Sequence, residues 1–144
     1  MSKRIVVGYD GSESGANALE FAAGLAKASG AGLVIAHVLE WSPYTFLTPT
    51  EIEERHKRRT EELERAESAV LAPVLKKLES SGLEVSTALR YGHIAETLIK
   101  IAEEEGVEHL VIGRTGHSSL STRIFGSVAG SLAQAAPVPV TIVP

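Results

Sequence analysis

Four small residues near the end of the chain have the types and the spacing needed to hold an anion. Gly113 and Gly116 are separated by two residues, and nine residues after Gly116 come Gly126 and Ser127. Glycines let the main chain approach a bound group closely and adopt positive φ, and the free N–H groups of Ser127 and Val128 at a helix N-terminus attract negative charge. The pattern therefore predicts a cradle for phosphate groups.

The charges around this motif favour the same kind of ligand. No acidic residue follows Glu108, whereas Arg114, His117 and Arg123 lie within or beside the loop. The chain as a whole has 14 basic and 18 acidic residues and a net charge of −4, so it lacks the basic character that nucleic-acid binding requires. We therefore expect no nucleic-acid partner, but a local preference for a small anionic ligand.

The elements that must position the motif alternate between short apolar strands and amphipathic helices. Strands are expected at residues 5–7, 33–38, 85–89, 110–112 and 138–143. As a group they are rich in Val and Ile, and most have apolar residues at consecutive positions, which is typical of parallel strands covered on both faces. Helices are expected at residues 14–28, 51–81, 93–105 and 127–135. This alternation predicts an α/β fold, a doubly wound parallel sheet of five strands with helices on both faces.

Local signals set the boundaries of these elements. Ser12 is expected to be the N-cap of the first helix, which Gly30 closes. Pro73 falls inside the expected helix at residues 51–81 and should kink or split it. Residues 41–50 form the one long irregular connection, and we expect this segment to be mobile or to act as a lid.

Length and composition predict one domain without disulfides or a membrane span. The 144 residues, 44% of them apolar, are enough for one compact domain, which we place at residues 1–144. The absence of cysteine excludes disulfides and suits a cytoplasmic location, and the apolar run near the N-terminus is too short for a secretory signal. The uncharged stretch at residues 124–144 holds three prolines, so we expect a helix and a strand there and no membrane partner.

The closing strand carries prolines whose positions predict how it pairs. N–H groups of alternate residues in a strand point to opposite sides, so Pro137 and Pro139 share a side with Thr141 and Val143. Proline has no N–H donor and is tolerated at the edge of a sheet. We therefore expect the proline side to face outward, leaving Thr141 and Val143 to pair with a twofold mate in a homodimer.

The glycine motif and its surroundings resemble the universal stress proteins, specifically the branch that binds ATP. The signature of that branch is Gly-x2-Gly-x9-Gly-Ser/Thr, and Gly113, Gly116, Gly126 and Ser127 match it in full. The resemblance covers essentially the whole chain, from the first strand and the Asp-Gly-Ser turn that follows it to the closing strand. It departs from the family outside the phosphate motif, where His109 replaces a common Asp.

The resemblance implies a strand order of 3-2-1-4-5, a homodimer, and ATP bound with Mg²⁺ that the phosphates mainly hold. By matching position, Asp10 would contact the ribose or the adenine, and the main chains of Val38 and Ile112 would border the adenine. The phosphates would be held by Gly113, Gly116, Gly126, Ser127 and Val128. His93, after the third strand, replaces a more usual small or proline-containing sequence.

Several functions remain open at this point. The chain has neither the P-loop pattern Gly-x4-Gly-Lys-Ser/Thr nor the dinucleotide pattern Gly-x-Gly-x-x-Gly after a strand. A regulator that binds ATP is expected ahead of a slow ATP-hydrolysing or group-transferring enzyme, because only Asp10 and His117 are placed to act as a general base. The third alternative is a module for another adenylated or phosphorylated metabolite. Asp10 also has the simpler role of a helix cap, and His37 that of a satisfied buried residue.

Overall fold

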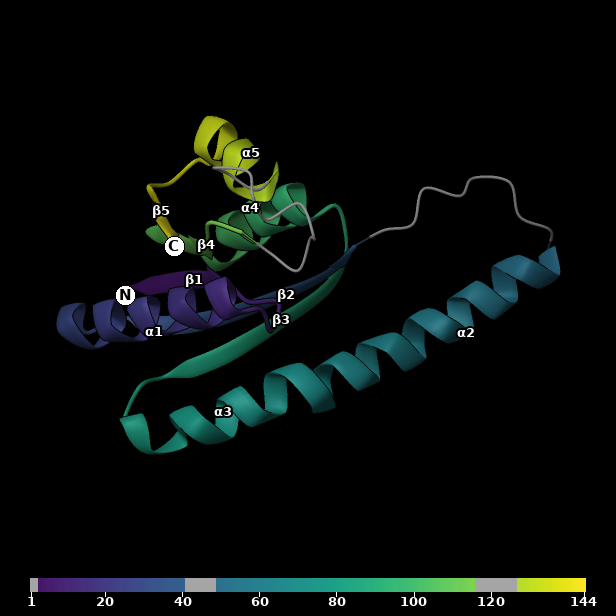
Figure 1. Cartoon of the computed structure of the whole chain (residues 1–144), viewed down its shortest axis with the longest axis horizontal. Helices are drawn as coiled ribbons and strands as arrows, with labels where there is room; N and C mark the ends of the chain where they lie inside the picture. Colours follow the sequence, from purple (N-terminus) through teal and green to yellow (C-terminus); the bar gives the residue numbers. More distant parts are fainter. Residues whose placement is uncertain (1–2, 41–48, 116–126) are drawn as a thin grey trace.

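The computed structural model describes residues 3–40, 49–115 and 127–144, which form three layers with a parallel sheet in the middle (Figure 1). The described strands make one five-stranded sheet in the order β3-β2-β1-β4-β5, and every neighbouring pair is parallel. The strands are β1 (Arg4–Gly8), β2 (Gly32–Glu40), β3 (Val85–Gly92), β4 (His109–Gly113) and β5 (Val140–Val143). The predicted doubly wound sheet and the strand order implied by the family resemblance are both confirmed.

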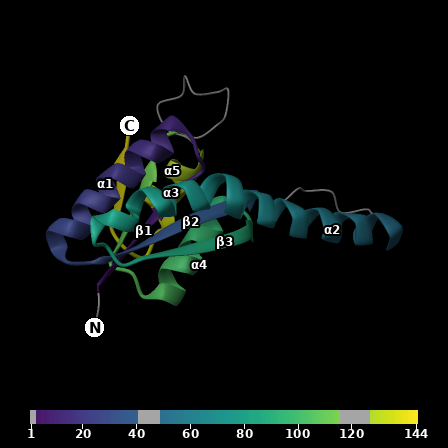
Figure 2. The same ribbon diagram turned by 90° about the horizontal axis from the view of Figure 1, so that it is seen from below.

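Helices cover both faces of the sheet, as predicted (Figures 1 and 2). They are α1 (Glu13–Ser29), α2 (Pro49–Ala66), α3 (Ala72–Leu78), α4 (Ile94–Glu105) and α5 (Ser127–Ala135). Residues of α1 and α3 pack with Val7 and Ile35 on one face, whereas residues of α4 and α5 pack with Val6 and Val34 on the other. Successive strand residues therefore supply two separate apolar clusters. No helix in the described ranges is long and apolar enough to cross a bilayer.

The first helix is capped at both ends by the residues that the sequence predicted, and it extends one residue beyond the expected range 14–28 at each end. Ser12 Oγ accepts a hydrogen bond from the N–H of Gly15 at 3.0 Å, so Ser12 is the N-cap. At the other end Gly30 adopts a left-handed φ of 68°, and its N–H donates to the carbonyl of Ala26. These caps fix the N-terminus of α1 directly after the turn that follows β1.

The helix expected at residues 51–81 is split near Pro73, as predicted. α2 is followed by a π-helical turn, η1 (Glu67–Leu71), then by α3 with Pro73 in its first turn, and by a 3₁₀ turn, η2 (Glu79–Ser81). The proline nitrogen has no hydrogen to donate and its ring crowds the preceding turn, and the π-helical turn widens the helix at this point. α2 begins at Pro49, earlier than expected, and the rest of the predicted lid, residues 41–48, lies outside the described residues.

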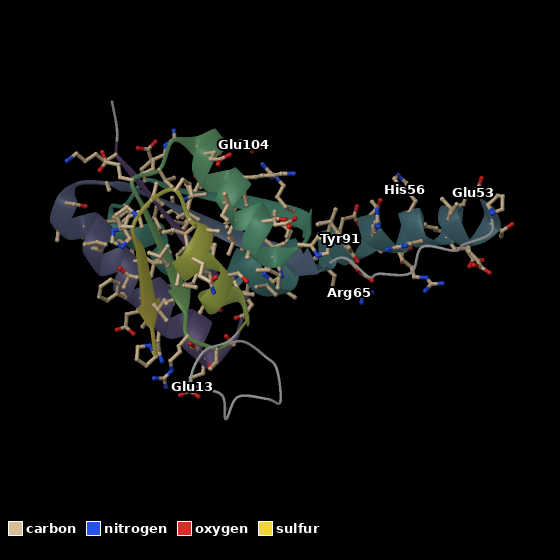
Figure 3. The ribbon with its side chains drawn as sticks, turned by 90° about the horizontal axis from the view of Figure 1, so that it is seen from above. Glu13, Glu53, His56, Arg65, Tyr91 and Glu104 are labelled. Atoms are coloured by element: carbon tan, nitrogen blue, oxygen red, sulfur yellow. The ribbon has the colours of Figure 1, made fainter. Side chains whose placement is uncertain are left out.

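α2 projects past the sheet and is held at the end of β3 (Figures 1 and 2). The hydroxyl of Tyr91 donates to Glu62 Oε2 at 2.8 Å, and Arg59 Cζ lies 5.0 Å from the centre of the Tyr91 ring. The hydrogen bond to Glu62, together with burial, raises the pKa of Tyr91 above its ordinary value of 10.0. Figure 3 shows Tyr91 at this junction, with Glu53 and His56 on the projecting part of the helix.

The hydrogen bonds between β4 and the edge strand β5 reveal which side of β5 faces inward. The N–H of Leu110 donates to the carbonyl of Pro139 at 3.0 Å, and the N–H of Arg114 donates to the carbonyl of Val143 at 2.7 Å. The N–H and C=O groups of one strand residue point to the same side, and residues two apart share that side. The odd-numbered residues of β5 therefore face β4.

The prediction that Thr141 and Val143 point outward is consequently wrong. The outward main-chain groups of β5 belong to Val140 and Ile142. Pro139 faces β4 through its carbonyl, which accepts a hydrogen bond even though its nitrogen cannot donate one, so the missing N–H does not turn this side outward. The edge of the described sheet is therefore not blunted by Pro139, and two donors of β5 remain directed away from β4.

Candidate functional site

The candidate site lies at the carboxyl edge of the sheet, where β1 and β4 are neighbours. The chain leaves β1 for β2 on one side and later returns to β4 on the other, so the strand order reverses at this pair. Ligands of doubly wound proteins bind beyond the carboxyl ends of the strands at such a point. Asp10 follows β1, Gly113 ends β4, and α5 runs back from the same edge starting at Ser127.

Strand β2 extends past the end of β1 and directs main-chain groups toward the site. β1 ends at Gly8, opposite Ala36, whereas β2 continues along β3. The N–H of Tyr9 donates to the carbonyl of Ala36 at 2.8 Å, so the even-numbered residues of β2 turn their main-chain groups to the β1 side. The next even residue, Val38, has no β1 partner in the strand register. Its N–H and C=O therefore face the space past the end of β1.

The side chain of His37 ends the ladder between β1 and β2. Its Nδ1 lies 2.7 Å from the carbonyl oxygen of Tyr9, which can only accept, so Nδ1 carries the proton. That carbonyl is the acceptor that the N–H of Val38 would otherwise reach in a continued ladder. His37 is 7% exposed. His37 is thus a satisfied buried residue, as predicted, and it leaves the main chain of Val38 available to a ligand.

Asp10 folds back onto the turn that it begins. Its Oδ1 accepts the N–H of Ser12 at 2.9 Å and also the hydroxyl of Ser12. Ser12, and not Asp10, caps α1, so Asp10 supports the cap from outside the helix. Gly11 adopts a left-handed φ of 82° in this turn, and a Cβ on Gly15 would lie 2.6 Å from Asp10 Oδ1. One oxygen of the carboxylate is therefore committed to the turn, beside a residue whose lack of a side chain makes room for it.

At the end of β4 the main chain of Ile112 pairs with β5 and its side chain lies in the core. Leu110 and Arg114 turn their N–H groups to β5, so Ile112 between them does the same. The N–H of Ile112 is thus directed to β5, and the place beside the adenine that the family resemblance implies for its main chain stays a prediction. Its side chain packs under the end of β1, where a Cβ on Gly8 would lie 3.2 Å from Ile112 Cγ2.

Gly113 is explained by close packing. It is not among the described glycines with positive φ, so the backbone freedom suggested by the sequence is not used at this position. A Cβ on Gly113 would lie 2.5 Å from Ser14 Oγ and 2.8 Å from the main-chain carbon of Ser14. No side chain fits between the two segments. Gly113 therefore lets the first turn of α1 contact the end of β4 directly.

The rest of the predicted phosphate loop is described only at its end. Gly116 and Gly126 lie outside the described residues, as does His117. Ser127 is the first residue of α5, and Val128 is half-buried against the cluster formed with α4. α5 begins at the carboxyl edge of the sheet. The N–H groups of its first turn therefore point toward the edge at which Asp10 and Val38 also lie.

Acidic and histidine side chains do not gather into a metal site in the described part of the chain. His109 lies at the start of β4, with its Nε2 2.6 Å from Thr141 Oγ1, and so links β4 to β5. His93 occupies the N-cap position of α4 without a capping bond from its side chain. A divalent cation bound with a nucleotide at this edge would therefore depend on the phosphate oxygens for most of its ligands.

Two residues that shape this edge were not singled out from the sequence. Gly15 makes room for the carboxylate of Asp10, and Ser14 contacts Gly113. In the sequence they stand out only as two small residues in the first turn after the Ser12 cap. Small residues at a helix start allow it to approach a neighbouring strand closely. Their importance depends on how α1 meets β4, which a single sequence does not encode locally.

The parallel strands in the order β3-β2-β1-β4-β5, with the order reversing between β1 and β4, define a doubly wound α/β protein. A sequence profile of the universal stress protein family matches residues 1–144, and the chain belongs to this family. It is 31% identical over 147 residues to universal stress protein YxiE of Bacillus subtilis, with 99% of each chain covered. The family expected from the glycine motif is thus confirmed.

Solved structures of the family have the same fold. The universal stress protein UspA from Lactobacillus plantarum superposes with a TM-score of 0.84 at 22% identity, over 99% of this chain and 97% of that one. A universal stress protein solved in complex with cAMP superposes with a TM-score of 0.63 at 26% identity, over 99% of this chain and 96% of that one.

Proposed function

We propose that this protein binds ATP at the carboxyl edge of its sheet and acts as a nucleotide-dependent regulator through a dimer. The observation that carries the proposal is the main chain of Val38, which faces the space past the end of β1 at the same edge of the sheet as the end of β4 and the start of α5. The glycine and serine spacing from Gly113 to Ser127 supports it from the sequence. The relative solved in complex with cAMP, an adenine nucleotide, supports it by analogy.

The main chain of Val38 suits adenine in particular. Its C=O would accept a hydrogen bond from the N6 amino group of adenine, and its N–H would donate one to N1. Guanine carries the reverse pattern, an acceptor at O6 and a donor at N1, so the same main-chain pair opposes it. The main chain of Ile112 would border the base from the β4 side, and Asp10 would contact the ribose or the base from the turn after β1.

The phosphates would extend from the end of β4 to the N-terminus of α5. There they would meet main-chain N–H groups and the positive end of the helix, and the chain carries no acidic residue after Glu108 to repel them. Mg²⁺ would screen the charge of the phosphates and be held mainly by their oxygens. The residues assigned to this region are Gly113, Gly116, Gly126, Ser127 and Val128.

Slow hydrolysis of ATP, or group transfer from it, is the weaker alternative at the same site. A general base must be able to accept a proton from the attacking water. Asp10 has one oxygen engaged by both the N–H and the hydroxyl of Ser12, which favours its role in the turn. Measuring phosphate released from ATP decides between the two functions.

We place the dimer at β5, through its outward main-chain groups. Val140 and Ile142 lie on the edge strand of the described sheet with their N–H groups directed away from β4. Edge strands pair readily with another chain, and a twofold axis would pair two copies antiparallel. The last residue of β5, Val143, accepts the N–H of Arg114 next to the candidate phosphate loop, so the interface and the site are adjacent.

ATP with Mg²⁺ is expected to raise the melting temperature of the protein. At a hundredfold excess over the dissociation constant, binding adds about 2.7 kcal/mol to the free energy of unfolding. For a chain of this length that corresponds to a rise of roughly 5 to 11 °C. GTP at the same concentration should give a smaller rise, because of the reversed donor and acceptor at its base. Thermal-shift curves of protein freed of carried-over nucleotide check this, and a flat curve at millimolar ATP contradicts it.

A further inference from the structure

The hydroxyl of Ser14 joins three segments that are distant in the sequence. Its Oγ donates to the carbonyl of Val143 at 3.2 Å and accepts the N–H of Thr115 at 3.3 Å. The same carbonyl of Val143 accepts the N–H of Arg114 at 2.7 Å. In Figure 3 the start of α1, marked by Glu13, lies beside the end of β5. One buried hydroxyl therefore ties the start of α1 to the residues after β4 and to the end of the edge strand.

This hydroxyl is not needed to cap the helix. Ser12 is the N-cap, and its Oγ takes the N–H of Gly15. A serine inside a helix usually bonds to a carbonyl of the preceding turn, whereas Ser14 reaches residues 101 and 129 positions away. Ser14 is 8% exposed. Its bonds therefore serve the contact between segments and add nothing to the helix itself.

The main chain at residues 113–115 is consequently held at consecutive points. Gly113 packs directly on Ser14. A side chain at residue 113 would overlap Ser14. Arg114 is bonded to β5, and Thr115 is bonded to Ser14. A glycine-containing loop loses much conformational freedom when it orders around a ligand, and ordering it beforehand improves affinity.

We propose that Ser14 is a positioning residue that orders the first residues of the phosphate loop before nucleotide binds. The proposal rests on the nucleotide site proposed above, because it assigns residues 113–115 to that site. Ser14 acts through Thr115 and Val143 and does not itself contact the ligand. Ser14 also links the loop to β5. A shift of β5 that moves Val143 would therefore disturb the loop as well.

Ser14→Ala tests this role because it removes both bonds and keeps a small side chain. We expect the N–H of Thr115 to exchange with deuterium at least about fivefold faster in the nucleotide-free protein, and the dissociation constant for ATP to rise about fivefold to tenfold. Ser14→Cys keeps a side chain of similar size that is only a weak hydrogen-bond donor. Because the role of Ser14 depends on its hydrogen bonds and not on filling space, Ser14→Cys should weaken ATP binding as Ser14→Ala does. NMR exchange and calorimetric titration supply the two readouts.

Ser29→Ala is the matched control at the other end of α1. The hydroxyl of Ser29 donates to the carbonyl of Leu25 at 2.8 Å, on the surface and within the same helix. It should change neither readout. Unchanged ATP affinity in both Ser14 variants, an unchanged exchange rate at Thr115, or an equal loss in Ser29→Ala would overturn the inference. Failure of the proposed function is recognised separately, because the wild-type protein would then bind no ATP while exchange at Thr115 still reports the anchoring.

Discussion

Gly126→Val is expected to weaken ATP binding by at least about a hundredfold and to leave the fold intact. Gly126 directly precedes α5, which begins at Ser127. A β-branched side chain at this position would occupy the space in which a phosphate group approaches the first N–H groups of the helix. Calorimetric titration with ATP and Mg²⁺ measures the affinity, and the far-UV circular dichroism spectrum should match that of the wild-type protein.

Gly130→Val provides a matched control for this variant. Gly130 lies within the same helix, and a Cβ there would have no atom within 4 Å. Glycine and valine differ by only a few tenths of a kcal/mol in intrinsic helix preference, so the fold should tolerate the change. We expect Gly130→Val to bind ATP like the wild-type protein. Equal loss of binding in the two variants, or full binding by Gly126→Val, would show that the phosphates are held elsewhere.

Ile142→Pro is expected to convert a dimer of this protein into a folded monomer. The substitution removes an outward N–H from β5 while leaving the residues that face β4 in place. In a twofold interface the lost hydrogen bond is lost twice, so the dissociation constant should rise by about tenfold to a hundredfold. Light scattering across a dilution series measures the change.

Two further variants separate this effect from lost packing. Ile142→Ala removes the same apolar side chain from the cluster with α4 and α5 but keeps the N–H, so it should remain a dimer. Thr141→Pro removes a donor on the β4 side, so it should lower the free energy of unfolding by about 1 kcal/mol or more. A dimer of unchanged strength in Ile142→Pro places the interface away from β5.

The arrangement of the sheet could be predicted from the sequence because its signals are local or repeated. Runs of Val and Ile at consecutive positions marked strands buried on both faces, and the alternation with helical patterns left one topology class. Ser12 and Gly30 marked the ends of α1 through capping chemistry that acts within a few residues. Pro73 disrupted its helix for an equally local reason, its missing N–H.

The features that escaped prediction depend on contacts between distant segments. Which side of β5 faces inward is decided by its register with β4, and a proline carbonyl accepts from β4 as readily as any other. The packing role of Gly113 depends on Ser14, 99 residues earlier in the chain. The availability of Val38 depends on the imidazole of His37 taking the carbonyl of Tyr9. None of these relations leaves a periodic or spaced pattern in a single sequence.

The most direct test of nucleotide binding without rapid turnover is a joint measurement of bound nucleotide and released phosphate. The full chain is incubated with ATP and Mg²⁺, separated from free nucleotide, and assayed for both products. We expect about one ATP bound per chain, as a single site implies, with no phosphate released beyond that of a buffer control. Protein that retains no nucleotide under these conditions, or that releases phosphate over many turnovers, would contradict the proposed function.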